Sequence, residues 1–134
     1  MDSTAIPPKL AALLDNHPSQ RTALLTCGLT GAGKSTLARA ILSQYLNFVR
    51  LSIDSTVLRT RGVYRRDYAP ELRAGFQEEA EVSIKSELKQ LLEAGKKDVV
   101  LDMAFYARET RDEYRGLIEK YGRGGYRVVL VVLR

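Results

Sequence analysis

The sequence is short of residues that tie a chain together covalently or through a metal. Its 134 residues include one cysteine, Cys27, and one histidine, His17. A lone cysteine excludes an internal disulfide, and together the two residues supply no Cys/His cluster of the kind that binds structural zinc. We therefore predict a reducing, cytoplasmic environment.

Long apolar segments are missing as well. No run approaches the ~18 apolar residues of a membrane-spanning helix, and the N-terminal residues show no apolar signal core. Hydrophobic residues make up 45% of the chain and charged residues 28%, which is ordinary for a globular protein. We therefore expect one globular domain and no membrane partner.

Charge of one sign is only in mild excess. The formal net charge is +5 at pH 7. An excess of positive charge favours an anionic partner such as a nucleotide or a nucleic acid. A solvated basic surface explains the same value, so net charge alone leaves both interpretations open.

Short apolar runs alternate with helical patterns along the chain. Strands are expected at 22–27, 48–53, 97–101 and 126–133, and the main helices at 34–46, 71–94 and 108–121. Segment 54–69 lacks a clear period and is expected to be a loop or broken helix. Residues 1–20 are expected to form an N-terminal arm with a short helix from Pro8 to Leu14. Because the strands look buried on both faces, we predict an α/β domain over residues 21–134 with a parallel sheet and right-handed crossovers.

A glycine-rich run follows the first expected strand. Residues 28–35 read Gly-Leu-Thr-Gly-Ala-Gly-Lys-Ser and match G-x-x-x-x-G-K-[ST] between an apolar strand and an amphipathic helix. Its backbone N–H groups and the helix start attract phosphate oxygens. Lys34 is expected on the β- and γ-phosphates of ATP, and the Ser35 hydroxyl on Mg²⁺. The predicted cofactor-binding residues are Thr30, Gly31, Ala32, Gly33, Lys34, Ser35 and Thr36.

Two aspartates follow later strands. Asp102 ends the run Val-Val-Leu-Asp and is predicted to be the second Mg²⁺ ligand, the alternative being a plain strand-ending turn residue. Asp54 is expected to end the second strand. Ligands bind beyond the carboxyl ends of an open parallel sheet, so Gly28, Asp54 and Asp102 should share one rim. Asp54 is predicted to accept a proton from an attacking hydroxyl, or alternatively to cap a helix.

Arginines at the start of the third main helix are further candidates. Arg108 and Arg111 have helical spacing and are predicted catalytic residues that face the site together with Asp54 and Lys34. Arg115 is expected to form an ion pair with an acidic neighbour on the same helix, either Asp112 or Glu119.

A second arginine-rich stretch, 59–66, is interleaved with Tyr64 and Tyr68. Charge beside aromatic stacking surface suits a phosphate-bearing substrate, including a nucleic-acid end. A solvated loop would have the same composition, and the sequence leaves both interpretations open.

The glycine-rich run, Asp54, the long helical pattern and the Val-Val-Leu-Asp strand together resemble small P-loop kinases. The nearest group is the ATP-dependent kinases that share a domain with polynucleotide 5′-hydroxyl kinases and zeta-toxin-like kinases, and the resemblance covers residues 23–133. It implies a three-layer P-loop NTPase fold with a parallel, adenylate-kinase-like sheet. It also implies that Asp54 activates the acceptor hydroxyl and that Asp102 is the acid after the third strand.

Two departures from these kinases bear on function. In many of them an arginine soon follows the activating aspartate, at the place of Val57, and here the nearest arginine is Arg59. They also continue past the fourth strand into an arginine-bearing lid helix and a fifth strand. We therefore expect a chain shortened after the fourth strand, in which phosphate binding outlasts catalysis.

The sequence thus predicts an ATP-dependent kinase that transfers the γ-phosphoryl group to a hydroxyl of a small molecule or a nucleic-acid 5′ end. A nucleotide-switched or hydrolytic module is a second hypothesis, although the Asn-Lys-x-Asp run that specifies guanine is absent. A module that binds nucleotide without turnover is a third. The acceptor and the oligomeric state are not specified by the sequence.

Overall fold

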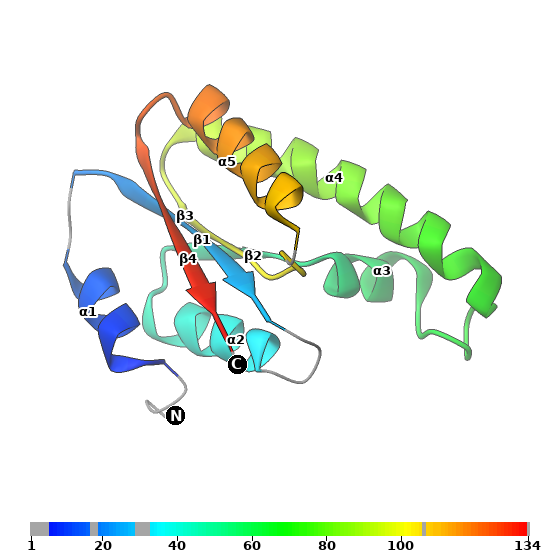
Figure 1. The fold of residues 1–134 in the computed structure, drawn as a ribbon. Helices are drawn as coiled ribbons and strands as arrows, with labels where there is room; N and C mark the ends of the chain where they lie inside the picture. Colours follow the sequence, from blue (N-terminus) through cyan, green and yellow to red (C-terminus); the bar gives the residue numbers. More distant parts are fainter. Residues whose placement is uncertain (1–5, 17–18, 29–32, 106, 134) are drawn as a thin grey trace.

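Four parallel strands form one sheet in the order β2-β3-β1-β4 (Figure 1). The computed structural model describes residues 6–16, 19–28, 33–105 and 107–133. The strands are β1 (Arg21–Cys27), β2 (Phe48–Leu51), β3 (Asp98–Leu101) and β4 (Tyr126–Val132). The helices are α1 (Pro8–Asp15), α2 (Lys34–Gln44), α3 (Ile53–Arg61), α4 (Arg73–Ala94) and α5 (Arg108–Gly122), with a 3₁₀ helix η2 (Pro70–Leu72).

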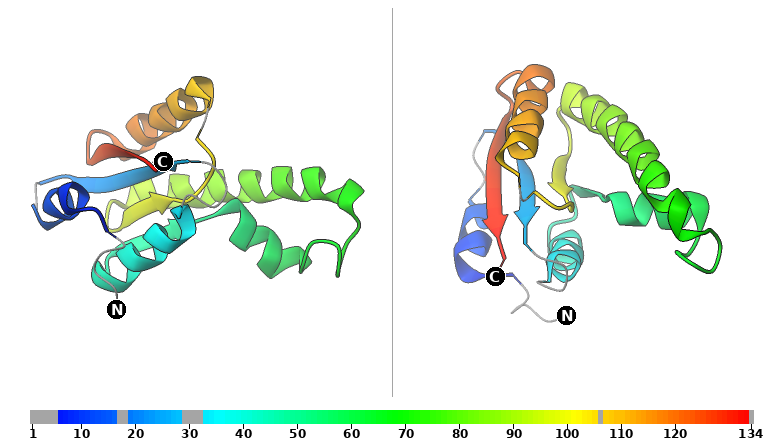
Figure 2. Two further views of the ribbon diagram at one scale, coloured as in Figure 1. Left: turned by 60° about the horizontal axis from the view of Figure 1, so that its bottom comes forward. Right: turned by 45° about the vertical axis from the view of Figure 1, so that its right-hand side comes forward.

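Helices cover both faces of the sheet, as Figures 1 and 2 show: α4 and α5 lie on one face, and α1 and α2 on the other. Alternate residues of a strand point to opposite faces. Leu25 and Val99 therefore pack with α4 and α5, whereas Leu24 and Val100 pack with α1 and α2. This confirms the three-layer α/β fold with a parallel sheet.

Burial differs between the strands. In β1 and β3 nearly every side chain is buried, because both strands have neighbours on two sides and helices on both faces. The strongly apolar β4 pairs only with β1 among the described residues, and its Val128 and Val132 are exposed. The expectation that every strand is buried on both faces is therefore wrong for this edge strand.

The N-terminal helix packs on the domain. Pro8 begins α1, as the sequence predicts, and Leu10 and Leu14 are buried in the same cluster as the apolar face of α2. The Tyr45 hydroxyl donates to Asp15 Oδ1 at 2.6 Å, and one guanidinium nitrogen of Arg127 donates to the carbonyl of residue 13 at 2.6 Å. The segment expected as an arm thus contributes to the core, while a domain boundary at residue 20 stays a prediction.

The segment after β2 corrects the sequence analysis. The second strand ends at Leu51 and not at residue 53, and residues 53–61 form α3. Of the two expectations for segment 54–69, a loop or a broken helix, its first part therefore fits the helix. Ser52 caps the helix, since its side chain accepts the Ser55 N–H at 3.2 Å, so Asp54 is neither strand-ending nor the cap. Only Val57 of α3 is fully buried, which explains why no helical period shows in the sequence.

The long helix α4 packs on the sheet only through its second half. Ala80, Ile84, Leu88 and Leu92 are buried, but Leu72, at the end of η2 just before α4, is 50% exposed. The first turns of α4 extend with α3 beyond the sheet, and Figure 2 shows this projection in both views. We call residues 53–79 the α3–α4 hairpin. No described helix combines the length and the apolar character needed to cross a bilayer.

Candidate active site

Strands β1, β2 and β3 all end at one rim of the sheet, and α2 begins there. Gly33 precedes the first residue of α2 with φ +96°, a backbone conformation that side chains disfavour. The Lys34 ammonium donates to the Gly28 carbonyl at 2.7 Å, which holds this charge beside the end of β1. The predicted residues Thr30, Gly31 and Ala32 lie outside the described residues.

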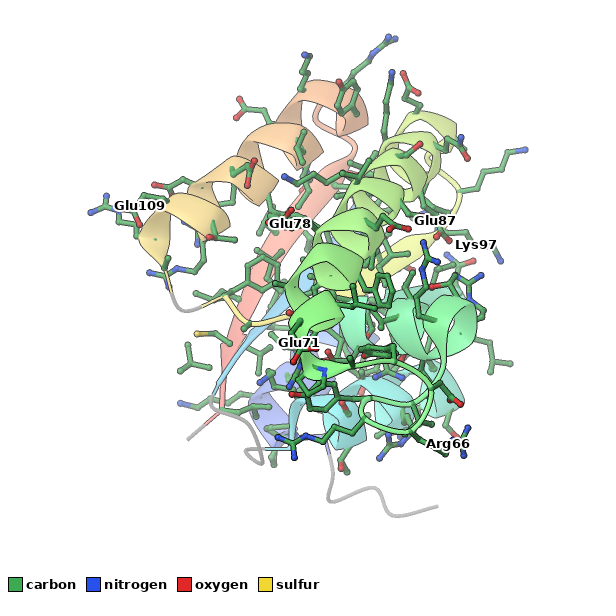
Figure 3. The ribbon with its side chains drawn as sticks, turned by 90° about the vertical axis from the view of Figure 1, so that its right-hand side faces the viewer. Arg66, Glu71, Glu78, Glu87, Lys97 and Glu109 are labelled. Carbon is green, nitrogen blue, oxygen red and sulfur yellow. The ribbon has the colours of Figure 1, made fainter. Side chains whose placement is uncertain are left out.

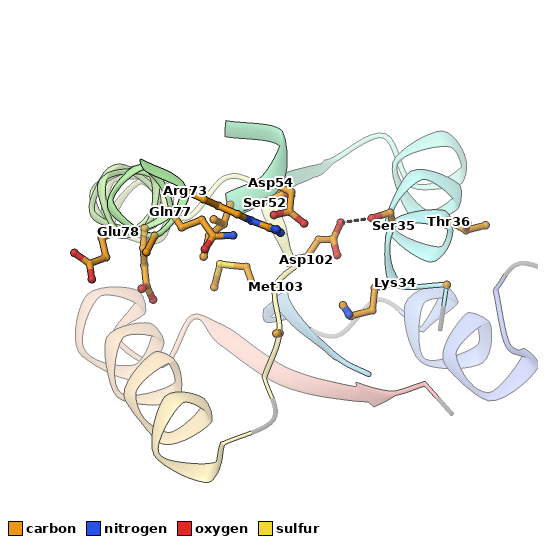
Figure 4. A pocket seen from close by; sticks show the side chains of 15 residues that line it. Lys34, Ser35, Thr36, Ser52, Asp54, Arg73, Gln77, Glu78, Asp102 and Met103 are labelled. Atoms are coloured by element: carbon orange, nitrogen blue, oxygen red, sulfur yellow. Dashed lines mark hydrogen bonds between the residues drawn. The ribbon is translucent and has the colours of Figure 1, made fainter. Parts of the chain in front are cut away.

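A cavity of about 810 Å³ opens at this rim between α2, α3 and α4, and we call it the main cavity. Figure 4 shows the side chains that line it. The segments that follow β1, β2 and β3 all contribute to its lining, as the rule for open parallel sheets leads one to expect. The structure thereby brings together these predicted residues: Gly33, Lys34, Ser35, Thr36, Asp54 and Asp102.

Asp102 is the most enclosed acidic group of the main cavity, with a side chain that is 4% exposed. Its Oδ2 accepts the Ser35 hydroxyl at 3.3 Å, drawn as the dashed line of Figure 4. The same oxygen accepts Arg50 Nε at 3.0 Å and Nη2 at 2.5 Å. Arg50 was missed by sequence reasoning, although an arginine inside the apolar run Phe48–Leu51 was a usable signal.

The donor set suits Mg²⁺. Ser35 offers a hydroxyl oxygen and Asp102 a carboxylate, and these side chains touch. Mg²⁺ is usually held by one or two protein oxygens together with substrate phosphates and water. Within the described residues no group of three or more His, Cys, Asp or Glu side chains gathers into a metal cage. A cation shared with bound phosphates therefore fits these residues better than a cation enclosed by protein.

Asp54 lies in the first turn of α3 and is exposed at the main cavity. Arg73 and Gln77 reach the same space from α4, and in Figure 4 their side chains extend from the helix toward the middle of the cavity. Glu78 and Glu81 also line it. We missed the polar residues of α4 because its apolar period indicated a core helix, whereas its first turns overhang the rim.

Tyr114, a buried residue of α5, holds Glu81 in place by a hydrogen bond. Its hydroxyl donates to Glu81 Oε2 at 2.8 Å, and its ring packs edge-on against Phe105 at 5.2 Å between centroids. Burial, followed by the hydrogen bond to Glu81, raises the pKa of the Tyr114 hydroxyl well above its usual value. The phenol therefore remains a hydrogen-bond donor to this wall of the main cavity at any physiological pH.

The arginines of α5 lie apart from the main cavity. The Arg108 side chain is 83% exposed, with Nε 3.7 Å from Asp112 Oδ2, and Arg111 Nη1 donates to the Phe105 carbonyl at 2.8 Å. Neither lines the main cavity, so their catalytic role stays a prediction. The expected pairing of Arg115 is confirmed, because its Nη1 lies 3.8 Å from Asp112 Oδ1.

Fold and site together define a P-loop domain of the kinase-like type. The sequence profile of a family described as an AAA domain matches residues 24–134. The chain therefore belongs to this AAA-domain family. A comparison with curated protein sequences gives no match.

Solved structures share the fold. A chain of the Pnkp1/Rnl/Hen1 complex superposes with a TM-score of 0.68 at 20% identity, covering 90% of this chain and 38% of its own. A chain of the PezAT chromosomal toxin-antitoxin system of Streptococcus pneumoniae gives 0.62 at 17% identity, covering 98% and 57%. The APS kinase CysC of Mycobacterium tuberculosis, as its Cys556Ala mutant, gives 0.55 at 18%, covering 87% and 78%.

These likenesses confirm the P-loop, kinase-like fold that the sequence resemblance implies. At such low identity they show the fold and not the substrate. The chain spans well under two thirds of the first of these structures, the chain of the Pnkp1/Rnl/Hen1 complex.

Proposed function

We propose that this domain is an ATP-dependent phosphotransferase that moves the γ-phosphoryl group of ATP to a hydroxyl acceptor. One observation carries the proposal: a single cavity joins the start of the phosphate-binding helix, with Lys34 and Ser35, to the carboxylates Asp54 and Asp102. A domain that only binds nucleotide needs Lys34, Ser35 and one carboxylate that helps to hold the metal, such as Asp102. The additional exposed carboxylate, Asp54, supplies a group for the second substrate.

The nucleotide end of the main cavity accounts for cofactor binding. Backbone N–H groups at the start of α2 and the Lys34 ammonium attract the phosphates. Ser35 and Asp102 would hold Mg²⁺, which supplies neutralisation of phosphate charge when bound. Their mutual hydrogen bond keeps both oxygens on one side of the main cavity. ATP and Mg²⁺ are therefore part of the proposal.

The acceptor end of the main cavity accounts for transfer. The acceptor oxygen forms a new bond to the γ-phosphorus while the bond from that phosphorus to the β–γ bridging oxygen breaks, and ADP leaves. The hydroxyl proton passes to the Asp54 carboxylate, which is exposed to the cavity and carries no competing role as a helix cap. Arg73 and Gln77 lie beside this carboxylate on the cavity wall and supply donors for the acceptor.

Substitution of Asp54 tests the proposal. Asp54→Asn keeps the size of the side chain but removes the proton acceptor, so transfer from labelled ATP to a panel of alcohols should fall about 10²–10⁴-fold. ATP affinity should stay near the wild-type value, because Asp54 is placed at the acceptor end. Glu71→Gln, in η2 outside the main cavity, is the matched control and should transfer normally.

Two results would contradict this assignment. Normal transfer by Asp54→Asn would show that another group receives the proton. Binding of ATP and ADP by the wild-type chain without transfer to any acceptor would favour a nucleotide-binding or hydrolytic module instead of a kinase. The predicted cytoplasmic location is untouched by either result and stays a prediction.

A further inference from the structure

A second, smaller cavity opens next to the main cavity on the α3–α4 hairpin. It has a volume of about 270 Å³, and its walls include Leu58, Val63, Tyr64 and Tyr68. We call it the aromatic cavity. Its size lies just below the ~300–1,000 Å³ of typical small-molecule sites, so it has room for one ring system and not for a whole nucleotide.

The two cavities share a border. Asp54, Arg73 and Gln77 line both of them, so the exposed Asp54 carboxylate faces the phosphate-binding residues on one side and the aromatic cavity on the other. A molecule that fills the aromatic cavity therefore has one end next to Asp54. That is the position in which an acceptor hydroxyl must lie if it is to meet the γ-phosphoryl group.

Tyr64 and Tyr68 form the aromatic wall of this cavity, and the turn that carries them holds them in place. Tyr64 and Tyr68 pair as an isolated β-bridge, and the Arg65 N–H donates to the Tyr68 carbonyl at 3.0 Å. Asp67 closes the turn, because its Oδ2 accepts the Val63 N–H at 2.6 Å and its own N–H donates to the Val63 carbonyl at 2.8 Å. Arg66, at the tip of this turn, points outward in Figure 3.

The rings are also fixed by each other and by arginines. The Tyr68 ring lies 5.9 Å from the Tyr64 ring and 5.0 Å from the Phe76 ring, measured between centroids. The guanidinium carbon of Arg73 is 4.6 Å from the Tyr64 centroid and that of Arg65 is 5.4 Å from it. A wall that is ordered before the ligand arrives loses little entropy on binding.

These contacts leave a cavity with aromatic and aliphatic walls, guanidinium groups at its edge and a carboxylate at its inner end. Aromatic and aliphatic walls favour an apolar or planar group over a hydrated, ringless one. The arginines of the hairpin are largely engaged: Arg61 bonds Glu79 at 2.6 Å and Arg66 bonds Asp67 at 2.9 Å. The hairpin thus offers a cavity of the size of one ring. It does not offer a row of unpaired arginines of the kind that binds the phosphates of a polynucleotide.

We propose that the aromatic cavity binds the acceptor, and that the acceptor is a small alcohol whose hydroxyl is attached close to an aromatic or other planar ring. The ring lies against Leu58, Tyr64 and Tyr68, and the hydroxyl lies at Asp54. This inference rests on the proposed phosphotransferase function for the role of Asp54. The binding of the ring does not depend on that function.

A binding experiment tests the cavity without requiring turnover. Ligand-detected NMR compares alcohols that carry a planar ring (uridine, adenosine and phenylethanol) with alcohols that carry no planar ring (ribose, glycerol and butanol), which are called ringless here.

Two variants show whether binding occurs in the aromatic cavity. Leu58→Trp fills the aromatic cavity from an exposed position, so folding should be unaffected. Leu72→Trp makes the same change at another exposed leucine that lines neither cavity. At least one ring-bearing alcohol should bind in preference to its ringless counterparts, and Leu58→Trp should weaken it by about tenfold or more while Leu72→Trp should not.

The outcomes separate this inference from the proposed function. Equal binding of ring-bearing and ringless alcohols, binding of none of them, or binding unaffected by Leu58→Trp would overturn the aromatic cavity as acceptor site, even if phosphoryl transfer is found. An oligonucleotide with a free 5′ hydroxyl is titrated in parallel, and its binding in the absence of binding by any of the small alcohols would overturn the proposal in favour of a polymer. Ring binding that responds to Leu58→Trp, in a chain that transfers no phosphoryl group, would sustain the cavity and refute the kinase assignment.

Discussion

Arg50 and Asp102 form an ion pair at the edge of the main cavity, with Arg50 Nη2 2.5 Å from Asp102 Oδ2. The arginine comes from the edge strand β2, and the aspartate follows its neighbour β3. Arg50 Nη2 also lies 3.4 Å from the Ser35 hydroxyl. The guanidinium therefore contacts both side chains that are proposed to hold Mg²⁺, so a cation bound there would compete with Arg50 for the Asp102 carboxylate.

Removal of this arginine should make the Mg²⁺ site easier to fill. A cation held by Asp102 would be repelled by the positive charge of Arg50. Two unit charges 4 Å apart interact by about 4 kcal/mol near a protein surface, and part of this repulsion is relieved when Arg50 turns toward solvent. We expect Arg50→Met to lower the Mg²⁺ concentration that half-saturates ATP binding by about tenfold, or ~1.4 kcal/mol. The measurement is the fluorescence of a labelled nucleotide titrated with MgCl₂. The variant without metal should also melt at a lower temperature.

Arg39→Met is the matched control, because Arg39 is an exposed arginine on α2 that does not line the main cavity. Its loss of one positive charge should leave the Mg²⁺ titration nearly unchanged. If Arg50 has only a structural role, Arg50→Met should lower the melting temperature and leave the Mg²⁺ dependence at the wild-type value. That pattern would refute competition between Arg50 and Mg²⁺.

Gly62 should resist substitution. It follows the last residue of α3 with φ +93° and ψ −157°, a combination that is essentially restricted to glycine. An added Cβ would also lie 2.3 Å from Asp67 Oδ2, the acceptor that closes the turn of the aromatic wall. Gly62→Ala should therefore destabilise the domain by about 1–3 kcal/mol, measured by denaturant unfolding. Hydrogen exchange should rise over residues 62–68.

Gly75 provides the comparison for this prediction. It lies in α4 with ordinary helical φ and with nothing within 4 Å of a built Cβ. Gly75→Ala should stabilise the domain by about 0.5–1 kcal/mol, because alanine loses less backbone entropy on entering a helix. Equal stabilities for Gly62→Ala and the wild type would show that the turn is not held as described.

The parts of the fold that the sequence predicts are those with a strong local signal. The apolar runs of β1 and β3 are strands because each is buried from two faces, and the glycine pattern before Lys34 marks the corner between β1 and α2. The shared rim of Lys34, Asp54 and Asp102 then follows from the geometry of a parallel sheet.

Other parts depend on long-range placement that no local pattern contains. Helix α3 buries only Val57, so its residues show no apolar period. Arg73 and Gln77 lie at the main cavity because the first turns of α4 overhang the rim, which depends on the angle of the whole helix. The partner of Arg50 belongs to another strand, and the pairing of β2 with β3 places it there.

The Tyr45–Asp15 bond predicts how α1 docking depends on pH. The hydrogen bond to Asp15, aided by desolvation and by the aspartate charge, raises the pKa of Tyr45 from 10.0 to about 12. A group whose pKa is raised on folding contributes stability that is complete below its unfolded pKa and is lost as pH rises through the folded value. The bond should therefore be intact at neutral pH and should weaken only between pH 10.0 and about 12.

Tyr45→Phe should therefore cost about 1 kcal/mol or less at neutral pH, since the bond is exposed to solvent, and the difference from wild type should shrink above pH ~10. Denaturant unfolding at several pH values gives the measurement. Asp15→Asn retains an acceptor but removes the charge, so the Tyr45 pKa should move back toward its ordinary value. A stability difference that stays constant up to pH ~12 would contradict the bond.

Loss of the Lys34 ammonium should weaken nucleotide binding more for ATP than for ADP. The ammonium is held beside the end of β1 by the Gly28 carbonyl at 2.7 Å, so the charge is in place before phosphate arrives. A hydrogen bond to a charged group contributes about 1.5–3 kcal/mol, so Lys34→Ala should reduce ATP affinity by roughly 10- to 150-fold, measured by calorimetry. Lys96→Ala, an exposed lysine outside the main cavity, should leave it unchanged. Undiminished ATP affinity in a folded Lys34→Ala variant would remove the basis for placing the phosphates at the start of α2.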